Sequence, residues 1–136
     1  MDPIITNGGH YVDHRGVLIH NNNFDASDVK RLYIIENNSN IIRRWQGHRI
    51  EQRWFSAIKG GFEIQLIRID DWVNPSKKLK KETFNISDKN LDILHIPDGY
   101  VTSIKSLKKE SKLLIMSDYK LDEIKDDYKF PSNYFE

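Results

Sequence analysis

Short apolar runs alternate with turn-forming segments along the chain. The apolar runs are rich in Ile, Leu, Val, Phe and Tyr, and the clearest are Val29–Glu36, Arg53–Lys59, Phe62–Ile69, Leu91–Ile96, Tyr100–Leu107 and Lys112–Ser117. Turn-forming residues separate them at Asn7–Gly9, Asn21–Asn23, Asn37–Asn40, Lys59–Gly61, Asn74–Ser76, Ser87–Asn90 and Pro97–Gly99. Many short strands with turns at this spacing are typical of a β-sandwich or barrel, so the pattern predicts an all-β fold.

Three local patterns refine this prediction. Apolar and polar residues alternate over Phe62–Leu66, which places the apolar side chains on one face of a strand. The Lys59–Gly61 segment lies between two predicted strands and predicts a tight hairpin, because glycine tolerates the positive φ angles of such turns. Leu113–Met116 is apolar throughout, which is typical of a strand buried on both faces but also of a short buried helix.

The C-terminal part contains the best candidate for a helix. Leu121, Ile124 and Tyr128 are spaced three and four residues apart, so we expect a short helical tail over Lys120–Lys129. The acidic stretch Asp118–Asp127 overlaps this segment, and two arrangements stay open, in which it either covers a pocket or packs outside one.

Composition and charge exclude several classes of protein. The 136 residues include no cysteine, which excludes disulfide scaffolds, thiolate zinc sites and cysteine nucleophiles. The 21 Lys and Arg residues nearly balance the 20 Asp and Glu residues, whereas a dedicated nucleic-acid-binding protein normally has a strongly basic face. The apolar runs are far shorter than the roughly 20 residues of a membrane-spanning helix, and Met1–Ile4 does not begin like a signal peptide. We therefore expect one cytoplasmic domain over residues 1–136.

The segment Ile41–Phe55 concentrates side chains that can carry chemistry. It holds four arginines, one histidine, one carboxylate, two amides and two tryptophans. Alternate residues of a strand share a face, so Gln46, His48 and Gln52 are placed to project together into the mouth of a barrel. Polar groups that converge beside aromatic walls are typical of a small-ligand pocket, and arginines match phosphate oxygens. The alternative is an edge strand whose arginines lie on the surface.

Short motifs occur in a particular order along the chain. They are Asp13–Leu18, Lys30–Ile35, Arg43–Arg49 followed by Glu51-Gln52, Leu94–Gly99, and Ser117–Tyr119. In this order they resemble the D-x-R-G-x-L/F, K-R-V-Y-Y-I, R-G-x-H-x-H-K, I-P-x-G and S/T-x-Y motifs of the cupin-fold nucleotide-sugar enzymes. These enzymes are the dTDP-4-dehydrorhamnose 3,5-epimerases and especially the shorter dTDP-sugar 3,4-ketoisomerases. The resemblance covers most of the chain and implies a cupin, which is a double-stranded β-helix or jelly-roll barrel.

Two departures from these motifs bear on the reaction. The paired histidines of the family become Gln46 and His48, and glutamine does not accept and release a proton at working pH. The tyrosine acid of the epimerases aligns with Leu114, so a double epimerisation at C3 and C5 is not expected. The loss of one cupin histidine also removes the usual two-histidine metal site, and we predict neither a metal nor a cofactor. The remaining histidines are scattered along the chain at His10, His14, His20 and His95.

The resemblance also implies roles for substrate-binding residues. Arg15 and Arg43 match positions that hold the diphosphate, where arginine makes bidentate, charge-assisted hydrogen bonds. Gln46 and Gln52 are predicted to bind and orient the substrate from the same face as His48.

Three further residues are predicted to act in catalysis. His48 corresponds to the histidine that looks catalytic in the ketoisomerases, and it is the expected general base because it titrates near neutral pH; the alternative is a hydrogen bond within the sheet. Arg53 lies where the epimerases place a lysine that stabilises an enolate oxygen, and a fixed cation serves that purpose. Tyr33 is predicted to stack on the base or sugar, or to donate a proton, with simple packing as the alternative.

Together these residues predict a nucleotide-sugar isomerase or epimerase of the dTDP-4-keto-6-deoxyhexose type, in deoxysugar synthesis for surface polysaccharide such as lipopolysaccharide. It abstracts a proton next to the ketone and passes through an enediolate. The alternative is a cupin that binds a nucleotide sugar as a regulatory or scaffolding partner, which Gln46 and Leu114 favour; a more remote one is a structural domain with surface arginines. The family forms homodimers that exchange an N-terminal strand, so we expect a homodimer, with no nucleic-acid or membrane partner.

Overall fold

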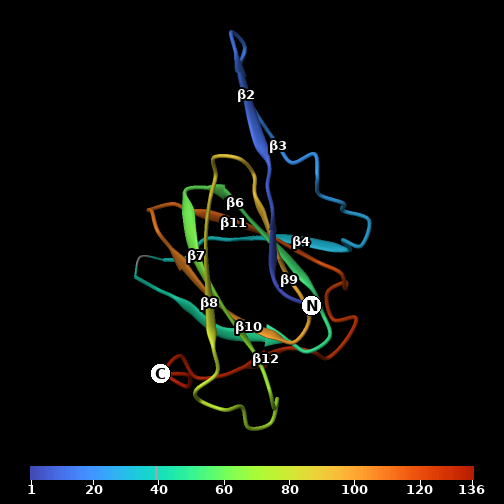
Figure 1. The fold of residues 1–136 in the computed structure, drawn as a ribbon, viewed down its shortest axis with the longest axis vertical. Helices are drawn as coiled ribbons and strands as arrows, with labels where there is room; N and C mark the ends of the chain where they lie inside the picture. The colour runs from blue at the N-terminus through green and yellow to red at the C-terminus, as the bar shows by residue number, and fades with distance from the viewer. Residues whose placement is uncertain (39) are drawn as a thin grey trace.

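The computed structural model describes residues 1–38 and 40–136, and the regular elements in this part are all β-strands (Figure 1). Ser39, which belongs to the predicted turn at Asn37–Asn40, lies outside the described residues. In chain order the strands are β1 (Ile4–Thr6), β2 (Gly9–Asp13), β3 (Gly16–His20), β4 (Arg31–Ile35), β5 (Arg43–His48), β6 (Arg53–Lys59), β7 (Gly61–Arg68), β8 (Lys81–Ser87), β9 (Ile93–Ile96), β10 (Tyr100–Ser106), β11 (Lys112–Ser117) and β12 (Tyr128–Lys129). The all-β prediction is confirmed, and the described chain forms no helix with the length and apolar character needed to cross a membrane.

Two five-stranded antiparallel sheets make up the body of the molecule. The first sheet has the strand order β1-β9-β6-β11-β4 and the second has the order β12-β5-β10-β7-β8. Strands that follow one another along the chain often lie in different sheets, which is the connectivity of a jelly roll. The strands β2 and β3 form a separate two-stranded hairpin.

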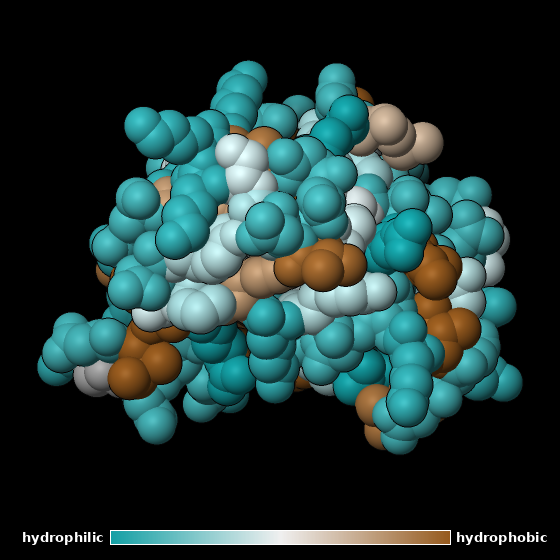
Figure 2. Space-filling model, turned by 90° about the horizontal axis from the view of Figure 1, so that it is seen from below, coloured by the Kyte–Doolittle hydropathy of each residue, from teal (hydrophilic) through white to brown (hydrophobic). Residues whose placement is uncertain are grey.

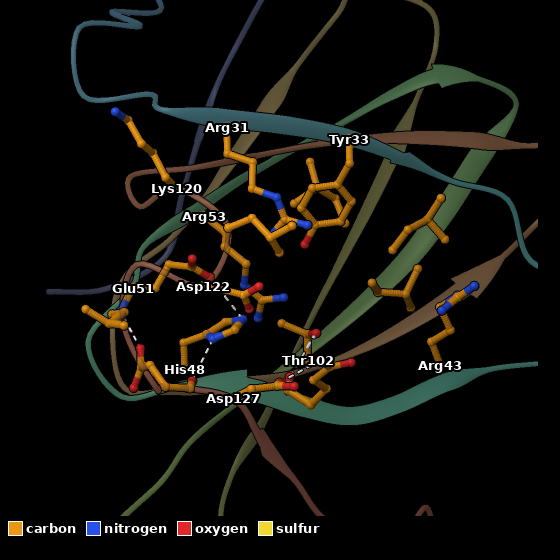
Figure 3. A pocket seen from close by; sticks show the side chains of 17 residues that line it. Arg31, Tyr33, Arg43, His48, Glu51, Arg53, Thr102, Lys120, Asp122 and Asp127 are labelled. Carbon is orange, nitrogen blue, oxygen red and sulfur yellow. Dashed lines mark hydrogen bonds and ion pairs between the residues drawn. The ribbon is translucent and has the colours of Figure 1, made fainter.

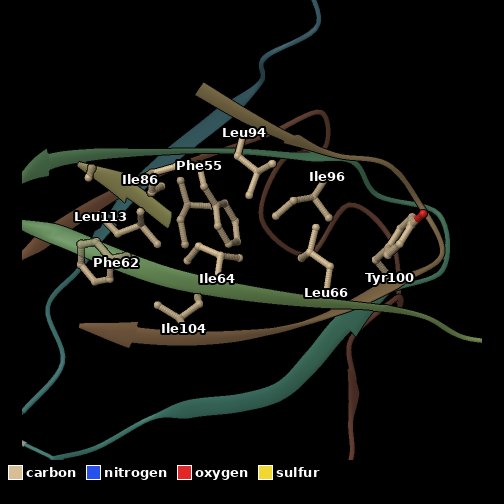
Figure 4. Packing of buried hydrophobic residues seen from close by; sticks show 12 residues of the cluster. Phe55, Phe62, Ile64, Leu66, Ile86, Leu94, Ile96, Tyr100, Ile104 and Leu113 are labelled. Carbon is tan, nitrogen blue, oxygen red and sulfur yellow. The ribbon is translucent and has the colours of Figure 1, made fainter. Parts of the chain in front are cut away.

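The main core lies between the two sheets and is built from the inward-facing residues of both (Figure 4). Phe55 and Leu113 of the first sheet and Ile64 of the second are fully buried there. The predicted alternation over Phe62–Leu66 is confirmed, because its apolar residues are buried and its polar ones are only half-buried. The apolar run Leu113–Met116 is a strand rather than a helix, since it pairs as β11 with β4 on one side and β6 on the other.

The predicted hairpin at Lys59–Gly61 is wrong, although the turn itself is present. Gly60 has a φ angle of 72°, and the N–H of Gly61 donates to Ser111 Oγ at 3.2 Å. However, β6 pairs with β9 and β11, whereas β7 pairs with β8 and β10. The turn therefore carries the chain from one sheet to the other, and glycine supplies the positive φ that this tight corner requires.

The predicted helical tail over Lys120–Lys129 is also wrong. Residues 120–127 form turns and irregular backbone, and Asp122 has a φ angle of 60°, which is not helical. Tyr128–Lys129 then pairs as β12 with β5. The physical reason is tertiary: the buried carboxylate of Asp126 bonds to the loop after β5, and these bonds fix a path that a regular helix does not follow.

Beyond β12, the chain end covers the outer face of the second sheet. Phe135 packs there with Trp45, Ile67 and Val101 in a second buried apolar cluster. Residues 120–127 are therefore followed by a part of the chain that is fixed in place, because β12 pairs with β5 and Phe135 packs in the second apolar cluster.

The β2–β3 hairpin projects from the body along the long axis of the molecule (Figure 1). Its large apolar side chains are exposed, namely Tyr11, Val12, Val17, Leu18 and Ile19. Figure 2 shows the opposite end, where hydrophilic side chains dominate and the hydrophobic ones form small separate patches.

Candidate functional site

A pocket of about 430 Å³ lies between strands of the two sheets (Figure 3). Its walls come from β4, β6 and β11 of the first sheet, from β5 and β10 of the second, and from residues 120–127. Sites for small molecules commonly have volumes of about 300–1,000 Å³. Charged side chains of both signs line this pocket, and they are Arg31, Arg43, Arg53, Lys120, Glu51, Asp122, Asp126 and Asp127.

The alternation of β4 explains how its side chains reach the pocket. Arg31, Tyr33 and Ile35 line the pocket at every second position. Leu32 and Ile34, which lie between them, are exposed on the outer face.

A β-bulge decides which side chains of β5 enter the pocket. The register of β5 against β10 shifts at Trp45, which has no partner on β10. As a result, Arg43 lines the pocket together with Gln46 and His48, although strict alternation would select Arg44. Trp45 itself is buried in the second apolar cluster.

His48 is held at both ring nitrogens. Nδ1 lies 2.8 Å from the carbonyl oxygen of Asp126, and Nε2 lies 3.1 Å from Glu51 Oε2. The other carboxylate oxygen of Glu51 accepts a hydrogen bond from Ser117 Oγ at 2.7 Å. Burial, followed by the positive charge of Arg53, lowers the pKa of His48, whereas Glu51 opposes this shift. Burial therefore favours the neutral imidazole, which is the form that accepts a proton.

Asp126 attaches the C-terminal segment to the pocket. Its side chain is buried and accepts hydrogen bonds from the backbone N–H groups of Arg49, Ile50 and Glu51, at 3.0, 2.9 and 2.8 Å. The acidic segment thus covers one side of the pocket, which resolves the two arrangements left open by the sequence.

Arg53 is a buried cation with a donor available for a ligand. The residue is 4% exposed, and its Nη2 has no hydrogen-bond partner among residues 1–38 and 40–136. Its guanidinium carbon lies 5.1 Å from the centre of the Phe55 ring. Burial lowers the pKa of Arg53, while Tyr33 and Glu51 oppose that shift. A buried guanidinium that lines a cavity is suited to bind a negatively charged oxygen.

Most of the residues predicted from the sequence meet in this pocket, namely Tyr33, Arg43, Gln46, His48 and Arg53. Gln52 lies elsewhere, with its Oε1 2.7 Å from His95 Nε2 and its Nε2 3.4 Å from Asp118 Oδ2. Arg15 lies in the turn of the β2–β3 hairpin, where it forms an ion pair of 2.7 Å with Asp13. The binding roles of Gln52 and Arg15 stay predictions.

Other pocket residues were not predicted from the sequence. The position of Arg31 in the pocket could have been predicted, because Arg31 lies two positions before Tyr33 on a predicted strand and therefore shares its face. Glu51 belongs to a recognised motif, but nothing local indicates its contact with His48. Nothing in the sequence around Asp126 indicated that it contacts the pocket, since the local pattern of the tail predicts a helix.

The pocket has an apolar side chain from β11 near the position that aligns with the epimerase tyrosine. On β11 it is Ile115, and not the aligned Leu114, that lines the pocket, because Leu114 points to the opposite face of the strand. Neither side chain carries a proton to donate. Within the described residues, no three His, Asp or Glu side chains gather in an arrangement that could hold a metal ion.

Comparisons of the sequence found no matching protein-family model and no matching curated protein. Solved structures, by contrast, match over almost the whole chain. A mutant of the 3,4-ketoisomerase QdtA from Thermoanaerobacterium thermosaccharolyticum, in complex with TDP-4-keto-6-deoxyglucose, has a TM-score of 0.73 at 19% identity. This match covers 98% of the present chain and 91% of that chain.

Two further structures extend the comparison. The TDP-quinovose 3,4-ketoisomerase WlaRB from Campylobacter jejuni has a TM-score of 0.71 at 19% identity, and the match covers 98% of this chain and 97% of that one. The RmlC epimerase from Mycobacterium tuberculosis has a TM-score of 0.76 at 10% identity, with 98% and 72% covered. The predicted fold is confirmed: the chain has the cupin fold that dTDP-sugar 3,4-ketoisomerases share with RmlC-like epimerases.

Proposed function

We propose that this protein is a nucleotide-sugar isomerase that acts on a 4-keto-6-deoxyhexose linked to dTDP or to a similar nucleoside diphosphate. The observation that carries the proposal is the convergence of His48, Tyr33 and Arg53 on one pocket, with Arg53 Nη2 left without a partner in the described part of the chain. Structures with the same fold contain TDP or TDP-4-keto-6-deoxyglucose, which supports the substrate class.

The proposed reaction moves a ketone from C4 to C3 of the sugar. His48 accepts the proton of C3, and the electrons of the broken C–H bond enter an enediolate. Arg53 stabilises the negative oxygen of this intermediate, because its charge is already in place before the reaction begins. After the proton on His48 has exchanged with solvent, His48 delivers a proton to C4, while the Tyr33 hydroxyl relays the hydroxyl proton from O3 to O4. No atoms are gained or lost, so the reaction needs no further reactant.

Solvent exchange tests this function directly. The protein is incubated with dTDP-4-keto-6-deoxyglucose in deuterium oxide, and deuterium at C3 is measured by NMR. Catalysis predicts deuterium at C3 of the recovered substrate and at C4 of the 3-keto product. Binding without exchange would contradict the proposal and favour a cupin that holds a nucleotide sugar without turning it over. That second candidate is supported by Gln46 and Ile115, neither of which carries a titrating proton.

A further inference from the structure

The hydrogen bonds around His48 restrict where its protons lie. The carbonyl oxygen of Asp126, 2.8 Å from Nδ1, is only an acceptor, so Nδ1 carries a proton. Glu51 Oε2 lies 3.1 Å from Nε2, and without a proton between them a carboxylate oxygen and a ring nitrogen would set two lone pairs against each other. One proton therefore lies between His48 Nε2 and Glu51 Oε2.

Glu51 is itself fixed by the fold. Ser117 Oγ donates to Oε1 at 2.7 Å, and the backbone N–H of Glu51 donates to Asp126 Oδ2 at 2.8 Å. The side chains of His48 and Glu51 are 14% and 11% exposed. Since the contact is shielded from solvent, it differs from surface ion pairs, whose partners are held weakly.

Charges on several elements act on this pair. Arg53 on β6 and burial disfavour a proton on His48, whereas Glu51 and Asp126 favour it. The other titratable groups that line the same pocket are Arg31 and Tyr33 on β4, Arg43 on β5, and Lys120, Asp122 and Asp127 in the C-terminal segment. Glu51 is the carboxylate in direct contact with Nε2, so it is the group best placed to offset burial and Arg53.

We propose that Glu51 is a positioning residue that shares one proton with His48, so that the pair, and not the imidazole alone, takes up and returns the substrate proton. The catalytic part of this inference rests on the proposed isomerase function, but the pairing itself does not.

The chemical step follows from the proton count. Release of the shared proton to solvent gives the reactive form, in which the lone pair of Nε2 accepts the proton of the substrate C3. The C3–H bond breaks, its electron pair enters the enediolate, and the proton comes to lie between His48 Nε2 and Glu51 Oε2. The proton held by the pair exchanges with solvent, a proton from the pair then forms the new C4–H bond, and the pair returns to its form without a shared proton.

The variant Glu51→Gln tests the role of the carboxylate. Its amide N–H would donate to Nε2 and occupy the lone pair that must accept the substrate proton. We expect exchange at C3 to slow by about 10²-fold or more, the usual loss when acid–base catalysis is removed, while dTDP affinity is retained. Glu51→Asp, which keeps the charge, should recover part of the rate. Glu110→Gln, at an exposed carboxylate outside the pocket, is the matched control and should keep the wild-type rate.

A second measurement needs no substrate. In NMR titrations of the ¹⁵N-labelled free protein, we expect the His48 ring to titrate at lower pH in Glu51→Gln than in the wild type, with its remaining proton on Nδ1 in both. Circular dichroism verifies folding, and Glu51→Ala provides the same titration should the Gln variant not fold. An unchanged His48 titration, or exchange at the wild-type rate in folded Glu51→Gln, overturns the proposal. If the wild-type protein itself shows no exchange, the isomerase function fails, whereas the titration still decides whether the pair shares a proton.

Discussion

At the residue scale, His48 is the histidine whose ring lines the pocket, between Asp126 and Glu51 and close to Arg53. The other histidines meet different surroundings. His14 is exposed in the turn of the β2–β3 hairpin, and His95 stacks on Trp54 with ring centres 5.3 Å apart. The histidines share one side-chain chemistry, and His48 differs from the others in its tertiary neighbours, on which its proposed role in proton transfer rests.

Replacement of His48 tests its proton-transfer role. His48→Asn keeps a hydrogen-bonding side chain but removes the group that carries the proton, so we expect exchange at C3 to fall by about 10²–10⁴-fold. The affinity for dTDP should change little. His14→Asn, outside the pocket, is the control and should exchange at the wild-type rate. Wild-type exchange in His48→Asn would remove His48 from the mechanism.

Arg43 is expected to contribute to diphosphate binding. Its side chain lines the pocket and its Nε donates to Asn37 Oδ1 at 2.9 Å, which orients the guanidinium. Loss of one charge-assisted contact costs about 1.5–3 kcal/mol, so Arg43→Ala should weaken dTDP binding by roughly ten- to more than a hundredfold in calorimetry. Arg49→Ala removes an exposed arginine of the same segment and should bind normally. Equal affinities in both variants would contradict the assignment.

The pKa of His48 also predicts how stability depends on pH. Burial lowers the pKa of His48 below the 6.5 of a free ring, so in acid the unfolded chain binds more protons than the folded one. The contribution of the neutral ring is fully present above about pH 6.5, and it is lost as the pH falls from this value toward the folded pKa. We expect urea unfolding to show a smaller decrease in the free energy of unfolding between about pH 7 and 5 in His48→Asn than in the wild type. His95, whose pKa burial also lowers, adds a decrease common to both proteins.

At the scale of elements, two irregularities build the site. The bulge at Trp45 turns Arg43 toward the pocket, and the irregular segment 120–127 covers one side of it. Neither is a regular strand, and both are stabilised by contacts with distant parts of the chain. The position of β5 relative to β10 and β12 thus decides the composition of the pocket.

Asp126 is expected to hold the covering segment in place. In Asp126→Ala three backbone N–H groups of the loop after β5 lose their acceptor. We expect the free energy of unfolding to fall by at least about 1.5–3 kcal/mol, which is the value of one charge-assisted hydrogen bond. Proteolysis within residues 118–127 should also become faster. Glu123→Gln, at an exposed position of the same segment, should behave like the wild type, and equal proteolysis of both variants would show that Asp126 is not the anchor.

At the scale of the whole molecule, the two ends differ in the polarity of their surfaces. The β2–β3 hairpin exposes large apolar side chains, whereas the end shown in Figure 2 is mostly hydrophilic. The edge strand β4 also presents apolar side chains to solvent at Leu32 and Ile34. Exposed apolar side chains next to an unpaired sheet edge favour association with a second chain. Arg15 lies in the turn of the same hairpin and not in the pocket of its own chain. In such a dimer it would contact a substrate bound in the pocket of the other copy.

We therefore expect a homodimer in which the hairpin of one copy lies on its partner. Light scattering at micromolar concentration should give twice the mass of the chain, and Leu18→Lys together with Val12→Lys in the hairpin should shift the protein toward monomer. Val73→Lys, at an exposed apolar residue in the loop between β7 and β8, is the control. A monomer mass for the wild type would contradict this prediction.

Several elements could be predicted from local patterns alone. The predicted strands Arg53–Lys59 and Lys112–Ser117 agree residue for residue with β6 and β11, because alternation and continuous apolar runs are properties of adjacent residues. The strand β8 (Lys81–Ser87) was not predicted, since Phe84 and Ile86 are its only apolar residues. The turn at Gly60 was correctly expected, but a turn does not specify which strands pair beyond it.

The sequence by itself determined the all-β class, the cupin fold through its ordered motifs, and most of the residues that meet in the pocket. Only the tertiary structure decided which sheet each strand joins, how the acidic segment folds, and that Asp126 contacts His48. The physical reason is the range of the interactions involved. Turn formation and strand alternation are encoded by neighbours along the chain, whereas the bond from His48 to Asp126 joins residues 78 positions apart and exists only once both sheets have formed.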